Sequence, residues 1–285
     1  MDIRTDLALE QKETKKGEIA GVISTEEKTG ALTVTRIKVT DEHGAAALKK
    51  SIGDYITVEI PPIDRHGGQW SQTVQVVVKE LRALLGQTNG TVLVVGIGNT
   101  DITPDALGPK TALGVLATRH ISRELCSQIG LDGLKSVAVL APGVLGQTGM
   151  ELQEIIKGAV ENIKPCAVIA VDALAARRVS RLGRTVQLSN TGISPGSGVN
   201  NARKELSRKT LGIPVIAMGV PTVVDARTLI YDFCGSTPKG STDENMIVTP
   251  REIDLMIDRA AELLSFSINV CLQPETDPEI IRALV

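Results

Sequence analysis

Hydrophobic and polar positions divide this 285-residue chain into two parts that meet at residue 90. In the second part, short apolar runs alternate with longer segments whose apolar residues recur at helical spacing. The runs cover residues 92–95, 136–140, 167–171 and 214–220. An unbroken apolar run of this length is typical of a strand that is buried on both faces of a parallel sheet. Strands that alternate with helices indicate βαβ units. The pattern therefore predicts an α/β fold, with a mostly parallel sheet and helices on both faces.

Helices are expected at five places in this second part. The segments with helical spacing or composition are Ala106–Leu125, Met150–Ile163, Ala202–Lys209, Thr222–Phe233 and Pro250–Leu264. Thr249 is expected to cap the last helix, because Pro250 suits its first position and Glu252 occupies the capping-box position. Thr185–Leu188 is predicted to be an edge strand, and the strand that begins at Pro214 is predicted to end before Pro221.

The first 90 residues are richer in strands of alternating apolar and polar positions. Glu18–Ser24 and Ala31–Thr40 are predicted to form a hairpin around the polar turn Glu26–Gly30. A short helix, a strand and a longer helix are predicted at Asp41–Ser51, Tyr55–Ile60 and Val74–Leu85. We interpret residues 1–90 as a β-rich N-terminal elaboration and residues 91–285 as the α/β core of one domain that spans residues 1–285.

Composition removes several classes of function. Hydrophobic residues make up 42% of the chain and charged residues 22%, as in ordinary globular proteins. Aromatic residues make up only 2% and the net charge is -2, so the chain lacks both the stacking rings and the basic patch of a direct nucleic-acid binder. No apolar run approaches the roughly 20 residues of a membrane span, and the charged start does not resemble a signal peptide. We expect an intracellular protein with no membrane partner.

Motifs for cofactors are also missing from the sequence. The four cysteines and three histidines are isolated and form no CxxC, which argues against a structural zinc site. The segment GIGNTD lacks the third glycine of a dinucleotide fingerprint, because Asp101 stands in its place. No phosphate-binding GxxxxGK[ST] motif is present. We therefore expect no cofactor.

Candidate chemistry gathers where the predicted strands end, because open α/β sheets bind ligands at the carboxyl ends of their strands. Two of these ends carry carboxylates: Asp105 in GIGNTDITPDALG and Asp172 in VDALAAR. Asp172 follows a wholly apolar run, and a charge at such a place costs several kcal/mol unless it is paired, solvated or protonated. The fold is expected to bring the two aspartates together.

The residues alone leave three interpretations of this pair open. Asp105 and Asp172 are each placed to cap a following helix. Two neighbouring aspartates can also share a proton, so that one deprotonates a water molecule while the other protonates an oxygen. Alternatively, the pair could hold a hard, oxygen-liking metal ion.

Further roles follow if the pair activates water. We lean to Asp105 as the base, because a helix N-terminus favours its anion, and to Asp172 as the acid, because burial favours its neutral form. The amides at Gly98 and Gly143 are weaker candidates for stabilising an oxyanion. Arg177 and Arg178 belong to a basic run that forms either a solvated face or a binding surface for an acidic peptide near the cleft.

Long blocks of the sequence resemble the germination protease family of spore-forming bacteria, which are atypical aspartic endopeptidases. The blocks occur in the family's order from Arg4 to about Asp254: RTDLALE, VGIGNTDITPDALGPKT, LAPGVLGQTGME, IAVDALAARRVSRLGRTVQLSNTGISPGSGVNNARKE, TLGIPVIAMGVPTVVDA and VTPREID. By this resemblance, the catalytic aspartates carry over onto Asp105 and Asp172. Substrates with an acidic motif would also give Arg177 and Arg178 a use in substrate binding.

The resemblance implies cleavage of small acid-soluble spore proteins during germination, a core similar to that of hydrogenase maturation proteases, a homotetramer, and a zymogen in the spore core. Two departures are visible. Only Met1 to Ile3 precede the RTDLALE block, where family members carry a propeptide, and the stretch Cys234–Met246 is short. Two alternatives remain: a metal-assisted peptidase of the maturation type, and a non-catalytic substrate-binding protein on the same fold.

Overall fold

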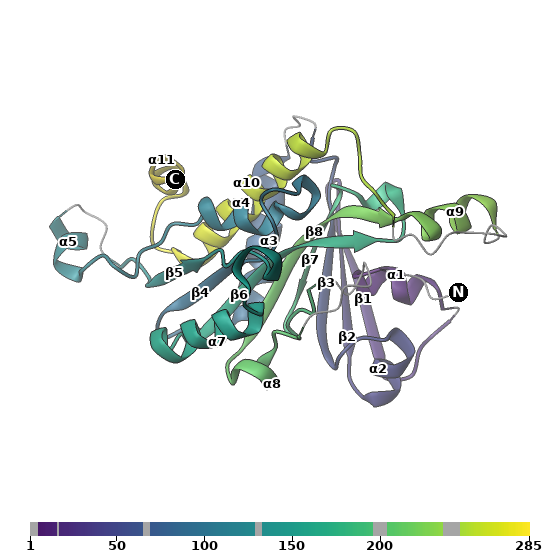
Figure 1. Ribbon diagram of the computed structural model, residues 1–285, viewed down its shortest axis with the longest axis horizontal. Helices are drawn as coiled ribbons and strands as arrows, with labels where there is room; N and C mark the ends of the chain where they lie inside the picture. The colour runs from purple at the N-terminus through teal and green to yellow at the C-terminus, as the bar shows by residue number, and fades with distance from the viewer. Residues whose placement is uncertain (1–4, 16, 65–68, 129–132, 196–203, 236–245) are drawn as a thin grey trace.

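One mixed β-sheet connects the two parts of the chain in the computed structural model, which describes residues 5–15, 17–64, 69–128, 133–195, 204–235 and 246–285. Among these residues, nine strands form the sheet in the order β1-β2-β3-β7-β8-β6-β4-β5, and the short strand β9 pairs with β8. Helices lie on both faces (Figure 1). The predicted α/β fold class is confirmed.

The parallel half of the sheet carries the apolar runs. Its strands are β4 (Val92–Gly96), β5 (Val137–Leu140), β6 (Ala167–Ala176) and β8 (Val215–Asp225). Strand β4 lies between β5 and β6, and β6 also pairs with β8. Every residue of β4 is buried, as expected of a strand covered on both faces.

The antiparallel half contains the strands of the first 90 residues. Its strands are β1 (Val22–Thr29), β2 (Leu32–Val39), β3 (Gly53–Glu59), β7 (Thr185–Ser189) and, at the side of β8, β9 (Ile247–Val248). The predicted hairpin is confirmed, but its turn is shorter than predicted, because Thr29 pairs with Leu32 across Gly30. Charged Glu26 and Glu27 lie within β1, which is an outer strand, where charged side chains are well tolerated.

Strand β7 joins the two halves. It pairs antiparallel with β3 on one side and with β8 on the other, and all five of its residues are buried. The prediction of an edge strand at Thr185–Leu188 was therefore wrong. Its polar Thr185 and Gln187 are buried inside the protein, so polar residues in this strand do not indicate an exposed edge.

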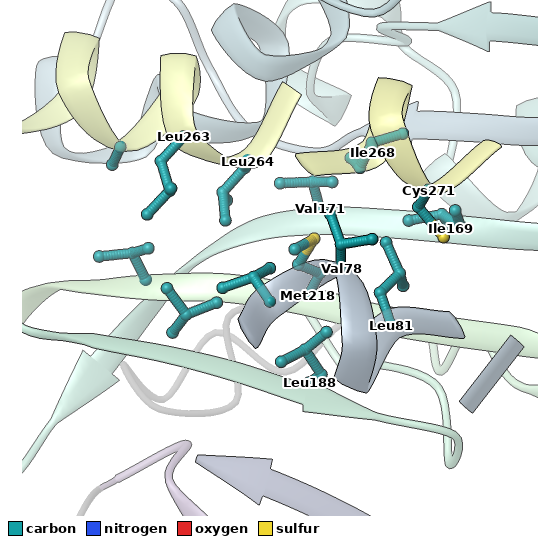
Figure 2. Close-up of a cluster of buried hydrophobic side chains, with 14 of the residues drawn as sticks. Val78, Leu81, Ile169, Val171, Leu188, Met218, Leu263, Leu264, Ile268 and Cys271 are labelled. Carbon is teal, nitrogen blue, oxygen red and sulfur yellow. The ribbon is translucent and has the colours of Figure 1, made fainter. Parts of the chain in front are cut away.

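The helices form two layers. They are α1 (Ala8–Glu13), α2 (Glu42–Leu48), α3 (Trp70–Leu85), α4 (Leu107–Leu113), α5 (Arg123–Gln128), α6 (Leu145–Thr148), α7 (Leu152–Ile163), α8 (Arg208–Leu211), α9 (Ala226–Cys234), α10 (Ile253–Leu272) and α11 (Pro278–Leu284). Helices α3 and α10 share one core with the sheet, and Figure 2 shows Val78, Leu81, Leu264 and Ile268 against Ile169 and Val171 of β6. Helix α7 packs on the opposite face. In the described part of the chain, no helix combines the length and the apolar character needed to cross a membrane.

Several helices begin or end at other residues than predicted. The segment Ala106–Leu125 is not one helix, because α4 ends at Leu113 and Gly114 lies so close to α10 that a Cβ there would be 2.6 Å from Ser265 Oγ. The last long helix begins at Ile253, and the Thr249 hydroxyl donates to the Thr222 carbonyl oxygen instead of capping it. Helix α8 covers only Arg208–Leu211; of the predicted range 202–209, residues 202 and 203 lie outside the described residues.

Strands β6 and β8 both continue well past their predicted ends. Strand β6 runs to Ala176, and β8 runs through Pro221 to Asp225, which then caps α9 by accepting the Thr228 N–H. The helix predicted at Thr222–Phe233 therefore begins only at Ala226. Pro221 is accommodated because the register shifts beside it: Leu174 pairs with Pro221 but Ala175 pairs with Val223. Irregularities of this kind are where strands admit proline.

Candidate active site

A cavity of about 330 Å³ opens beside β6, beyond the point where β4 ends. Asp105 and Asp172 both line it, so the structure brings together the two carboxylates that the sequence singled out. The walls also include apolar side chains such as Ile102 and Ile247, which are 51% and 47% exposed. The cavity thus combines carboxylates with an apolar rim.

Asp105 is held by the loop that follows β4. It is the last residue of a 3₁₀ turn, Thr103–Asp105, and its Oδ2 accepts the N–H of Asn99 at 2.8 Å. It does not cap α4, whose N-cap position is Ala106 without a side-chain hydrogen bond; that interpretation was wrong. Gly98 lets the loop fold back, because it has φ of +130° and a Cβ there would lie 2.0 Å from the Asp105 carbonyl oxygen.

Asp172 lies inside β6 rather than after it. Its side chain is nearly buried, with 5% of the residue exposed, and its Oδ1 accepts the N–H of Ala173 at 2.9 Å. It caps no helix, because the alanine-rich residues that follow continue the strand; the capping interpretation was wrong here too. Asp172 also lines a second cavity of about 220 Å³, whose lining includes Lys49, Lys50 and Tyr55.

Asp6 is a third aspartate at this place, and it was not among the residues predicted from the sequence to form the site. It lines both cavities with Asp172. Its N–H donates to the Ala175 carbonyl oxygen and its Oδ2 accepts the Ala175 N–H, both at 2.8 Å. Its own carbonyl oxygen accepts from Lys50 Nζ at 2.8 Å, and burial lowers the pKa of the Lys50 amine. Its neighbours in RTDLALE, Thr5 and Leu7, carry no signal of such a role.

Glu10 fastens the segment that carries Asp6 to the end of β6. Glu10 is 1% exposed. Its side chain accepts the backbone N–H groups of Arg177 at 2.6 Å and Arg178 at 3.0 Å. It also accepts the Thr5 hydroxyl and lies 3.5 Å from Arg181 Nε. These contacts fix one wall of the cavity from a region far away in sequence.

A sequence model of germination proteases matches residues 2–235. The chain belongs to the germination protease family. A germination protease of Clostridium tetani is 41% identical, with 99% of each chain covered. One of Caldanaerobacter subterraneus is 42% identical over 96% of this chain and 95% of the relative, and one of Oceanobacillus iheyensis is 48% identical over 81% and 66%. The resemblance seen in the sequence blocks is confirmed, and membership of this family supports a peptidase of spore germination.

In this member of the germination protease family, the arginines expected to bind substrate have other partners. The guanidinium group of Arg177 pairs with Asp232 of α9, with Nη2 at 2.6 Å from Oδ1, and Arg178 Nη1 lies 3.4 Å from Glu13. Neither arginine is among the residues that line the two cavities. A role in substrate binding stays a prediction for both.

The remaining candidates differ in their positions. Gly98 lines the larger cavity, whereas Gly143 does not, although its neighbour Val144 does. Their proposed role as oxyanion donors stays a prediction. Within the described residues, no three or more histidine, cysteine, aspartate or glutamate side chains gather as they would around a metal ion.

Proposed function

We propose that the protein is an aspartic-type endopeptidase that cleaves small acid-soluble spore proteins during germination, with Asp105 and Asp172 activating a water molecule between them. The observation that carries this proposal is the shared cavity: two carboxylates from different βαβ units line one space at the end of β4 and beside β6. Family membership supports the peptidase class.

The surroundings of the two carboxyl groups favour different roles. The Asn99 N–H donates to Asp105 and stabilises its carboxylate, so Asp105 suits the base. This hydrogen bond stands in place of the helix N-terminus that was predicted to favour the Asp105 anion. Asp172 is 5% exposed, and burial favours a neutral carboxyl group, so Asp172 suits the acid.

The proposed reaction returns both groups to their starting states. Asp105 takes a proton from water while the oxygen attacks the scissile carbonyl carbon and Asp172 protonates the carbonyl oxygen. Asp105 then gives its proton to the amide nitrogen as the C–N bond breaks, and Asp172 recovers a proton from a hydroxyl of the tetrahedral intermediate. The Gly98 N–H is the proposed donor to the developing oxyanion, with Gly143 as a weaker candidate. No cofactor takes part in this scheme.

The test is cleavage of a purified small acid-soluble spore protein by Asp105→Asn and Asp172→Asn, followed on gels and by mass spectrometry. Each variant is expected to lose at least about 10³-fold in kcat/KM. Asp225→Asn is the matched control, since Asp225 is also buried, at 4% exposed, but caps α9 outside the cavity. It should stay within about twofold of the parent, because asparagine caps helices as well as aspartate does.

Three results would replace the proposal. Full activity in either folded aspartate variant would remove that residue from the mechanism. Activity that disappears with a chelator and returns with a metal ion would favour the metal-assisted peptidase. Stoichiometric binding of spore proteins without cleavage would favour the non-catalytic alternative.

The proposed assembly and setting rest on the family resemblance. We propose a homotetramer that works in the spore core, is made as a zymogen, and binds its substrate proteins without contacting nucleic acid or membrane. Light scattering after gel filtration tests the assembly, and a mass of one chain would overturn the tetramer. Unchanged mobility of DNA at low salt is the result expected for a protein without nucleic-acid affinity.

A further inference from the structure

One edge of β6 is occupied on both sides of a short gap. Strand β4 pairs with β6 only as far as Val171, whose carbonyl oxygen accepts the Ile97 N–H at 2.8 Å. Four residues further on, Ala175 makes two hydrogen bonds with Asp6. The Ala175 N–H donates to Asp6 Oδ2, and the Ala175 carbonyl oxygen accepts the Asp6 N–H. The gap between these two contacts is centred on Ala173.

The main-chain groups of Ala173 face this gap. Alternate residues of a strand direct their N–H and C=O groups to the same edge. Val171 and Ala175 bond along the edge away from β8, so Ala173 between them does the same. Its N–H donates to Asp172 Oδ1 at 2.9 Å. Among the described residues, none pairs with the Ala173 carbonyl oxygen along this edge.

Ala173 is also where β6 meets the cavity. It is partly exposed, while the other nine residues of this ten-residue strand are buried, and it lines the larger cavity together with Asp105 and Asp172. The distance from Val171 to Ala175 along an extended strand is about 13 Å. Because Ile97 and Asp6 occupy the two ends, the gap has room for one paired residue of an added chain, not for a full strand.

We propose that this gap binds the main chain of the substrate, with one N–H of an extended peptide donating to the Ala173 carbonyl oxygen. The proposal rests on the proposed peptidase function and assigns the contact that positions the peptide. It commits to a peptide because the group at this sheet edge is a backbone acceptor, which is the partner of an extended chain. Asp172 directly precedes Ala173 in β6, so a peptide held here passes beside the proposed acid.

Apolar side chains at the rim suit such a peptide. Ile102 and Ile247 line the cavity and are about half exposed. An extended peptide would cover them with its own side chains, while the main-chain contact fixes its position independently of sequence.

The experiment uses a synthetic peptide from a small acid-soluble spore protein that the enzyme cleaves at one bond. In a series of analogues, one amide N–H at a time is replaced by an ester oxygen, leaving the scissile bond intact. The ester removes the donor but keeps the shape of the chain. One analogue is expected to lose about threefold to tenfold in kcat/KM, the effect of one hydrogen bond, while its neighbours stay within about twofold.

The loss should appear in KM, with kcat nearly unchanged, because the contact is made in both the ground state and the transition state. A flat ester series, together with inactive Asp105→Asn and Asp172→Asn variants, would overturn the main-chain contact and leave the peptidase proposal intact. Cleavage by both folded aspartate variants would overturn the peptidase proposal, whatever the ester series showed. The two failures are therefore distinguishable.

Discussion

Buried carboxylates in the two halves of the sheet have different hydrogen-bond partners. In the antiparallel half, Glu80 is 2% exposed and accepts two hydrogen bonds from Arg36, which lies on β2. Bonding to Glu80 raises the pKa of the Arg36 guanidinium above its usual value. In the parallel half, Asp105 and Asp172 accept main-chain N–H groups and line a cavity. The described lining of that larger cavity contains no cationic side chain, whereas the second cavity beside Asp172 includes Lys49 and Lys50.

This difference separates a structural use of acidic residues from the chemical use that we propose. An arginine partner holds both oxygens of a carboxylate in hydrogen bonds of fixed geometry, so such a pair serves to connect two elements of the fold. A carboxyl group that lines a cavity can reach a bound substrate and exchange a proton with it, as acid–base catalysis requires. Variants that disturb one half should therefore affect stability and activity in different proportions from variants that disturb the other.

The largest expected loss of stability is that of Arg36→Met. Glu80 would remain buried without its arginine, which should lower the free energy of unfolding by about 3 kcal/mol. Peptidase activity of the folded protein should stay within about twofold, because the pair lies outside the cavity. Urea denaturation gives the stability, and the double variant Arg36→Met/Glu80→Leu should recover most of it. A single variant as stable as the parent would show that the pair does not hold α3 on the sheet.

Gly98→Ala changes the parallel half of the sheet and should lower both the stability and the peptidase activity. Its positive φ and the 2.0 Å approach to the Asp105 carbonyl oxygen predict a loss of about 2 kcal/mol in unfolding free energy. Activity should fall about a hundredfold, because a shift of Asp105 misplaces the proposed base.

Gly158→Ala is the matched control for Gly98→Ala. Gly158 lies in α7 and a Cβ there would meet nothing within 4 Å, so alanine should stabilise the helix by about 0.5–1 kcal/mol. Activity of the control should be unchanged. A Gly98→Ala protein with parental kcat/KM would contradict the role given to this loop.

Cys271 lies on α10, in the helix layer that covers the sheet, so changing it shows how burial in that layer affects stability. Burial raises the pKa of its thiol from the ordinary 9.0 to about 11. In the unfolded chain the thiol keeps its ordinary pKa, so it ionises first and the unfolded state then binds fewer protons. Stability from this group is full below pH 9 and is lost as pH rises toward 11; at pH 10 the loss is about 1 kcal/mol. Urea denaturation at pH 8 and pH 10 should show that the unfolding free energy decreases less in Cys271→Val than in the parent protein. Equal decreases in both proteins would refute this account.

The smallest effect is expected at the outer strand. Lys28 Nζ lies 3.8 Å from Glu26 Oε1, and the two side chains are 74% and 57% exposed. Lys28→Met should change the unfolding free energy by less than about 0.5 kcal/mol and leave activity unaltered. Urea denaturation at low and high salt measures it. A larger, salt-dependent change would mean that exposed pairs also hold the antiparallel half together.

Sequence patterns predicted the elements whose local and tertiary preferences agree. The run Val92–Val95 gave β4, and the pair Asp105 and Asp172 could be singled out because each stands among apolar or glycine-rich neighbours. The continuation of β6 could not be foreseen. Residues 173–176 are mostly alanine, which favours helices, but pairing with β8 and with Asp6 holds them extended.

Long-range contacts account for the rest of what was missed. Asp6 has no local signal of a role, because its partners Ala175 and Gln187 lie 169 and 181 residues away. The gap at Ala173 is likewise invisible in the sequence, since it depends on where β4 stops and where the Asp6 segment begins. The sequence predicts a strand end at Pro221, because a register shift cannot be read from one strand alone.

The bond between Asp6 and Ala175 also has a consequence for synthesis. At the usual pace of translation, roughly 10 to 30 seconds separate the incorporation of these two residues. During that time the growing chain has no second wall for its cavity. Because Asp6 and Ala175 are far apart in the chain, the site cannot be completed until most of the polypeptide has been translated.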